Sequence, residues 1–220
     1  LLCYLVRRHY QYVTRAIQQL EADILPQIYS AKESRQETFD PKAPTAVLLV
    51  SGFNGLGLAT LTTLDRLFGG QFKNMVFISV GEVDSALLKG PEEVRQLEQQ
   101  VADDLNEYCQ LAADMGFHPE LRISIGPDVV AELKRLCLAV VKEFPQAVFF
   151  AGKLIFTDEL EGFISRFLHN HTALELQSWL QVHGMSLVIL PVRVANSKNP
   201  AQVGQGGTGE GAPPVGQSAA

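Results

Sequence analysis

TAVLLVSGFNGLG, residues 45–57, joins a short apolar run to a glycine-rich turn and then to the start of a helical pattern. The run is too short for a membrane segment and is rich in Val and Leu, which is typical of a buried strand. A helical period follows from about Leu58 to Phe68. A buried strand that leads through a turn into an amphipathic helix is the repeating unit of α/β sheets. The stretch therefore predicts an α/β fold.

The alternation of strand and helix continues to residue 194. Further strands are expected at 73–81, 120–126, 147–156 and 185–194, and helices at about 91–115, at 128–144 and within 168–184. Asp128 and Pro91 suit the first turns of helices, and Gly116 and Gly184 stand where C-terminal glycines belong. Such alternation gives right-handed crossovers and a parallel sheet covered on both faces. The expected fold class is α/β, a doubly wound five-stranded parallel sheet.

The first residues, LLCYLVRRHYQYV, place six apolar residues directly before Arg7, Arg8 and His9. Six residues cannot cross a bilayer, because a spanning helix needs about 20 apolar residues. The order from apolar to basic to amphipathic is nevertheless typical of the cytoplasmic end of a transmembrane helix. It is not the order of a signal peptide, whose basic residues come first. We interpret the chain as part of something longer.

Four regions follow from these patterns. Residues 1–30 are expected to hold the end of a last transmembrane helix and a juxtamembrane helix, 31–45 a linker, 46–195 the α/β domain and 196–220 a disordered tail. The juxtamembrane helix is indicated by apolar residues at helical spacing, with a disturbance expected at Pro26; these apolar residues are Val13, Ile17, Leu20, Ile24 and Ile28. The tail is dominated by Gly, Pro, Ser, Gln and Ala and cannot bury enough surface to fold.

Charge and cysteine content narrow the possible partners. The net charge is −6, which argues against nucleic acid as a partner, because that binding depends on cationic side chains that neutralise phosphates. The three cysteines Cys3, Cys109 and Cys137 are far apart, so neither a disulfide framework nor a CxxC metal site is predicted. A reducing compartment is consistent with them.

Two long stretches, VLLVSGFNGLGLATLTTLDRLFGGQFKNMVFISVGEVDS and LHNHTALELQSWLQVHGMSLVILPVRV, carry a resemblance to known proteins. Together with the order of elements and a fourth strand that ends AVFFAG, they resemble the universal stress protein fold. They are more closely similar to the cytosolic C-terminal region of bacterial permeases of the amino acid–polyamine–organocation superfamily. The resemblance covers residues 1 to about 194.

The resemblance implies a non-enzymatic regulatory or dimerisation domain of a secondary transporter for an amino acid or a cation. It implies a place at the cytoplasmic face of the inner (plasma) membrane, as part of an integral membrane protein. The expected partners are the membrane part of the same polypeptide and a second copy of the chain, paired through residues 185–194. Pro191 limits how far such strand pairing can extend.

A nucleotide-sensing domain is the main alternative. The carboxyl ends of strands are where doubly wound sheets bind ligands, so an adenine nucleotide or a cyclic dinucleotide would contact the backbone of Gly52, Asn54, Gly126 and Gly152. However, SGFNGLG spaces its glycines as GxxGxG rather than GxGxxG, and no GK[ST] follows. Nucleotide-binding universal stress proteins also carry an aspartate after strand one and a GxxG motif after strand four, and both are missing here. We therefore expect no cofactor.

Other candidate sites receive weaker support. Glu82 and Asp84 follow the second strand as a pair of carboxylates, but no partner base or nucleophile is near in sequence. His171 and Glu175 share a helical spacing that suits a metal, yet a third ligand is not evident, so no metal site is expected. Ser51 is not part of a GxSxG elbow. A stand-alone α/β enzyme is the least supported alternative, and no catalytic residue is assigned.

Overall fold

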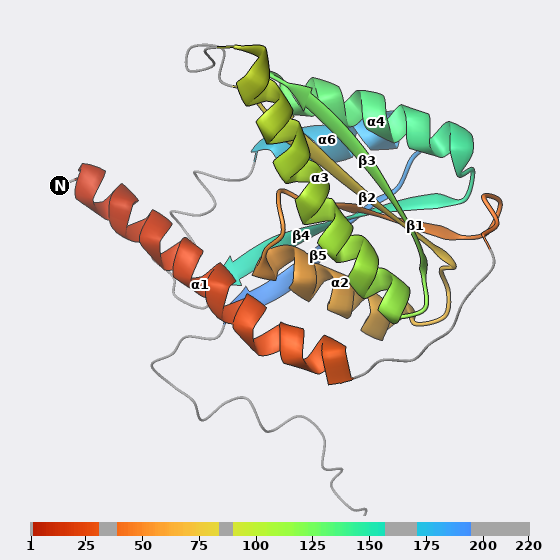
Figure 1. Ribbon diagram of the computed structural model, residues 1–220, viewed down its shortest axis with the longest axis horizontal. Coiled ribbons are helices and arrows are strands. Elements are labelled where there is room, and N and C mark those ends of the chain that lie inside the picture. The colour runs from red at the N-terminus through yellow and green to blue at the C-terminus, as the bar shows by residue number, and fades with distance from the viewer. Residues whose placement is uncertain (1, 31–38, 84–89, 157–170, 195–220) are drawn as a thin grey trace, which may run out of the picture.

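The structure is a computed structural model that describes residues 2–30, 39–83, 90–156 and 171–194. Its elements, in chain order, are α1 (Leu2–Ser30), β1 (Thr45–Leu49), α2 (Gly55–Phe68), β2 (Asn74–Glu82), α3 (Pro91–Asp114), β3 (His118–Gly126), α4 (Val129–Glu143), β4 (Ala147–Phe156), α6 (His171–Val182) and β5 (Leu187–Val194). The five strands form one sheet in the order β3-β2-β1-β4-β5, and every neighbouring pair is parallel (Figure 1). The predicted doubly wound α/β fold is confirmed.

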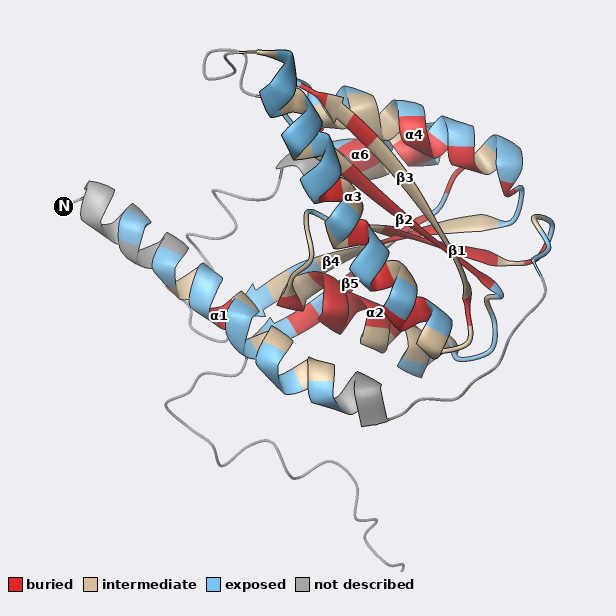
Figure 2. Ribbon diagram, viewed as in Figure 1, coloured by how far each residue is buried: buried red, intermediate tan, exposed pale blue. Residues whose placement is uncertain are grey.

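Helices cover both faces of the sheet because successive strand residues point to opposite sides. Ala46 and Leu48 of β1 belong to a buried cluster shared with α2 and α3. Val47, between them, belongs to a second cluster shared with α4 and α6. Two apolar layers therefore sandwich the central strands, which explains why β1 and β2 read as nearly continuous apolar runs (Figure 2).

The helix ends have the chemistry that the sequence predicts. Asp128 precedes α4, and its side chain accepts a hydrogen bond from the Ala131 amide at 3.0 Å. Pro91 stands in the first turn of α3. Gly116 and Gly184, which follow α3 and α6, have φ values of +94° and +73°. These left-handed conformations cost glycine little, so both residues end their helices as expected.

The long helix α1 packs on the outside of α2 rather than on the sheet (Figure 1). The apolar stripe predicted for it faces inward, since Val13, Ile17, Leu20 and Ile24 are all half-buried. Pro26 does not end the helix, which continues to Ser30. A proline this close to a helix end removes a single backbone hydrogen bond, and the remaining turn stays helical. None of the helices within the described ranges is long and apolar enough to span a membrane.

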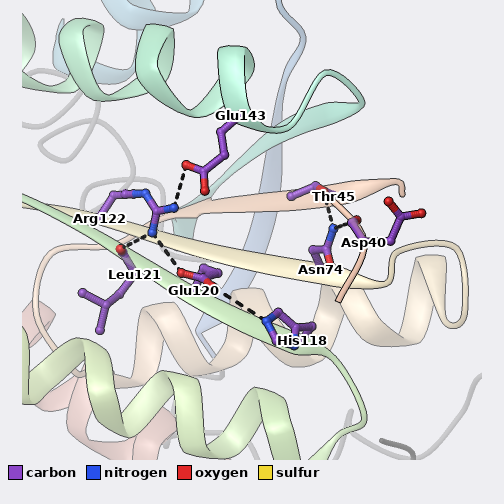
Figure 3. A network of polar contacts seen from close by, with 8 residues as sticks. All are labelled: Asp40, Thr45, Asn74, His118, Glu120, Leu121, Arg122 and Glu143. Atoms are coloured by element: carbon purple, nitrogen blue, oxygen red, sulfur yellow. Dashed lines mark hydrogen bonds and ion pairs between the residues drawn. The ribbon is translucent and has the colours of Figure 1, made fainter. Parts of the chain in front are cut away.

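Asn74 holds the amino edge of the sheet together (Figure 3). Its side-chain amide, completely buried at the start of β2, donates to the Asp40 carbonyl oxygen at 2.8 Å and to Thr45 Oγ1 at 3.0 Å. The segment that precedes β1 is thereby fixed to the first residues of β1 and β2. Asn74 Oδ1 is buried without a hydrogen-bond partner in the structure.

Arg122, in the middle of the edge strand β3, joins this strand to α4. Its guanidinium donates to the Glu143 carboxylate at 2.7 Å, to Glu120 at 3.1 Å and to the Leu121 carbonyl oxygen at 2.7 Å. These bonds neutralise a half-buried cation that desolvation would otherwise disfavour, and the pKa of Arg122 is raised. Charged side chains on the edge strand β3 also discourage pairing with another chain.

Replacing Asn74 by Asp should destabilise the protein by about 3 kcal/mol at neutral pH, because a buried carboxylate would face the Asp40 carbonyl oxygen without a donor. Burial would raise the pKa of this carboxyl above its unfolded value of about 3.9, so the deficit should shrink as the pH falls toward that value. Urea unfolding at pH 7 and pH 4 measures it. Asn74→Ala is the control and should show a smaller deficit without this pH dependence.

Candidate functional site at the glycine-rich turn

The turn after β1 lies where ligands bind in doubly wound sheets. The strand order reverses at β1, whose neighbours are β2 on one side and β4 on the other. Ligands of such sheets lie at the carboxyl ends of the strands beside this reversal. Residues 50–54 connect the end of β1 to the first residue of α2 at this place. The turn is therefore the first candidate for a functional site.

Asn54 caps α2 with its own side chain. Its Oδ1 accepts hydrogen bonds from the amides of Leu56 at 3.0 Å and Gly57 at 3.1 Å. Its Nδ2 donates to the carbonyl oxygens of Ser51 at 2.8 Å and Gly52 at 3.1 Å. Because the cap satisfies the first amides, α2 begins at Gly55, three residues before the predicted start. The Leu56 and Gly57 amides, which could otherwise bind a phosphate at this helix N-terminus, are therefore already hydrogen-bonded.

Tyr108 of α3 reaches into the turn from the other side. Its ring is fully buried, stacks on Phe77 with centroids 5.3 Å apart, and contacts Phe53 at 4.8 Å. The backbone amide of Asn54 donates to Tyr108 Oη at 3.2 Å. The Tyr108 hydroxyl can in turn donate to the backbone carbonyl oxygen of Asn54 at 3.2 Å or of Gly52 at 3.3 Å. Tyr108 therefore ties the backbone of the turn to α3.

The glycines of the turn allow these close approaches. A Cβ atom on Gly57 would lie 1.9 Å from Tyr108 Oη. A Cβ atom on Gly55 would lie 2.0 Å from the Ile17 carbonyl oxygen and 2.6 Å from the Glu21 amide nitrogen, both in the backbone of α1. The glycine pattern therefore follows from the packing of α3 and α1 against the first turn of α2.

The electrostatic surroundings of the turn are acidic. Burial raises the pKa of the Tyr108 phenol far above its usual value, and the carboxylates of Asp104, Glu21 and Glu107 raise it further. Gly52, with a φ of +76°, has the Asp104 carboxylate within 3.2 Å of the position that a Cβ would take. A phosphate placed here would meet carboxylates and a capped helix end. The position is therefore better suited to the packing of helices than to the binding of an anion.

The four residues predicted for a nucleotide site are only partly brought together. Gly52 and Asn54 share the turn, and Gly152 lies on the neighbouring strand β4. A Cβ atom on Gly152 would lie 2.1 Å from Thr60 Oγ1, so α2 closes over this residue. Gly126 ends the edge strand β3, with β2 between it and β1.

Gly126 belongs to a different polar cluster at the start of α4. The Glu132 side chain packs over it, within 2.9 Å of a Cβ position. Ser124 and Arg135 both donate hydrogen bonds to Glu132, and these bonds lower the pKa of its carboxyl. Arg135 also donates to Ser124 Oγ at 2.7 Å. The cluster therefore satisfies its own polar groups.

The remaining sequence candidates do not gather at the turn. Glu82 is exposed at the end of β2, and Asp84 lies outside the described residues. Glu175 pairs with Lys134 at 2.7 Å, while the side chain of His171 is not among those described. Within the described part of the chain, no group of three His, Cys, Asp or Glu side chains has the geometry of a metal site.

The two described cysteines are packing residues. Burial raises the pKa of the Cys109 thiol to about 11 and that of Cys137 to about 12. The thiolate is the reactive form of cysteine, so both side chains stay protonated and unreactive near neutral pH. Cys137 is buried and Cys109 is half-buried.

Tyr108 and Gly55 are the residues that sequence reasoning missed. Tyr108 continues the buried stripe of α3 that includes Val101, Leu105 and Ala112. A tyrosine on such a stripe needs a hydrogen-bond partner for its hydroxyl, and this requirement was the available signal. The sequence contained no corresponding signal for Gly55, because its contact is to the backbone of α1.

Comparisons with known proteins identify no family for this chain. No protein-family model matches the chain, and no curated protein matches its sequence. The class that the structure defines is a Rossmann-like, doubly wound α/β protein whose glycine-rich turn is a junction between α1, α2 and α3.

Tyr108→Phe should destabilise the protein by about 1–2 kcal/mol at pH 7, because the Asn54 amide loses a buried acceptor. The folded protein holds the Tyr108 pKa above its unfolded value of 10.0. This contribution to stability is therefore present below pH 10 and declines as the pH rises beyond it. Urea unfolding at pH 7 and pH 11 should show the gap between wild type and variant narrowing at the higher pH. A constant gap would contradict the proposed burial of the hydroxyl.

Gly55→Ala should weaken the packing of α1 on α2 by about 1–3 kcal/mol. The new methyl group would collide with backbone atoms that no rotamer change can move. Hydrogen exchange should accelerate in α1, while the amides of β1 and β2 stay protected. Gly90→Ala is the matched control, since a Cβ atom there would meet nothing within 4 Å. Equal protection of α1 in both variants would show that the close approach at Gly55 does not exist.

Proposed function

We propose that the chain is the regulatory, non-enzymatic cytosolic domain of a secondary transporter for an amino acid or a cation. The permease-like stretches of its sequence support this proposal, as does the universal stress protein-like order of its elements. The structural observation that carries it is the packing of α1 on the first turn of α2 at Gly55. A membrane part placed ahead of α1 would thus be connected to the domain at its glycine-rich turn.

The proposal gives α1 a mechanical role. Ile17 and Glu21 of α1 meet Gly55 through backbone atoms, and Gly57, two residues later, meets Tyr108 of α3. A shift of α1 therefore changes the packing of both helices that flank the turn. Regulation through this route requires two arrangements of α1 that a signal favours unequally.

The polar groups at the turn are hydrogen-bonded within the protein, which favours a non-enzymatic domain. The side-chain oxygen of Asn54 accepts hydrogen bonds in the cap of α2, and its side-chain nitrogen donates hydrogen bonds within the turn. The Tyr108 hydroxyl is buried among backbone groups, and its raised pKa leaves it without acid-base use near neutral pH. The same occupied groups make the nucleotide-sensor alternative the weaker proposal.

Among the described strands, the position of β5 supports the proposed dimer. It lies at one edge of the strand order, where an unpaired row of backbone groups can receive a second strand. Leu187, Leu190 and Val192 along it are buried beneath the helical layers, so a partner would meet mainly its backbone edge. Pro191 interrupts that edge and would restrict pairing to part of the strand.

The experiment uses the intact polypeptide encoded by the complete reading frame. We expect transmembrane segments ahead of Leu1 and a product that stays in the membrane after alkaline carbonate extraction. Gly55→Ala should then change the rate of solute uptake by whole cells at equal protein abundance, while Gly90→Ala leaves it unchanged. A product extracted into the soluble fraction, or equal uptake by both variants, would refute the proposal.

A further inference from the structure

Helix α1 has two faces of different character. The inward face is formed by half-buried apolar residues and packs on α2. The outward face holds five exposed residues at helical spacing, namely Arg7, Gln11, Thr14, Arg15 and Gln18. At 100° per residue, the mean directions of the two sets differ by roughly 135°. The outward stripe is therefore turned away from the domain.

The outward stripe is hollowed and cationic. The five residues line an open groove of about 430 Å³. Arg7 and Arg15 are separated by eight residues, or about 12 Å along the helix axis. The groove lining contains two arginines and neutral polar side chains, with no carboxylate among the residues named. The N-terminal half of α1 also projects beyond α2 (Figure 2).

We propose that this stripe is a docking surface for the anionic headgroups of a lipid bilayer, an inference that rests on the proposed juxtamembrane role of α1. Guanidinium groups bind phosphate oxygens in a bidentate manner, and glutamine side chains add neutral donors. The protein as a whole carries a net charge of −6, so an anionic bilayer repels most of its surface. The described residues that line the stripe include no carboxylate, so the stripe is the part of the described surface that charge turns toward an anionic bilayer.

The contact is electrostatic and lies at the headgroup level. The apolar face of α1 is engaged by α2, so it is not available for insertion between acyl chains. Attraction of arginine to an anionic surface amounts to about a fivefold gain in binding for each residue, and it falls off within a Debye length. The association is therefore weak for the separate chain, and high salt removes it.

The test is flotation of the 220-residue chain with lipid vesicles at low ionic strength. We expect association with vesicles of phosphatidylcholine and phosphatidylglycerol, none with phosphatidylcholine alone, and release in 1 M salt. The double variant Arg7→Glu and Arg15→Glu should reduce association by at least about 25-fold. The double variant Arg66→Glu and Arg193→Glu makes the same change in net charge at exposed positions on α2 and β5, and it should bind more tightly than the α1 variant.

Several outcomes would overturn the docking surface. These are equal binding to neutral vesicles, binding that resists 1 M salt, equal losses in the two double variants, and no binding to anionic vesicles. Hydrogen exchange of α1 confirms that the glutamate variant keeps its helix, and Arg7→Gln with Arg15→Gln should give an intermediate loss. Membrane extraction of the intact polypeptide is a separate measurement from vesicle flotation. A failure of the docking proposal and a failure of the transporter proposal can therefore be told apart.

Discussion

The hydroxyl of Tyr108 fixes the centre of this structure. It lies in a fully buried ring, where an unpaired polar group would be costly, and its partners are backbone groups of Gly52 and Asn54. The ring can take this position only because Gly57 has no side chain, since a Cβ there would lie 1.9 Å from the hydroxyl. Asn54 then completes the turn by capping α2. One buried polar group thus sets the path of the chain between β1 and α2.

The close packing of this turn decides what the position can do. In doubly wound sheets the end of the first strand is a common ligand site, with free helix amides as phosphate donors. Here the Leu56 and Gly57 amides donate to Asn54, and the backbone of α1 closely approaches Gly55. The position that a ligand would use in other sheets is used by the protein's own helices. This supports a mechanical connection through α1 as the proposed function.

Charge is distributed unevenly around the junction. The carboxylates of Asp104, Glu21 and Glu107 act on the Tyr108 phenol, whereas the outward stripe of α1 presents Arg7 and Arg15. The inner side of the junction therefore disfavours anions, and the outer stripe of α1 attracts them. The uneven distribution allows a protein of net charge −6 to meet an anionic surface in one orientation.

The sequence by itself determined the α/β class, the parallel sheet and most helix ends, because hydrophobic period and capping chemistry act over a few residues. Asp128 and Gly116 could be assigned in this way. The strand order, the separation of Gly126 from the turn and the role of Gly55 were decided only by the tertiary structure. These features depend on contacts between segments far apart in the chain, such as the hydrogen bond between Asn54 and Tyr108, which are 54 positions apart. Local patterns carry no information about which distant backbone approaches a glycine, and that approach gives this turn its role.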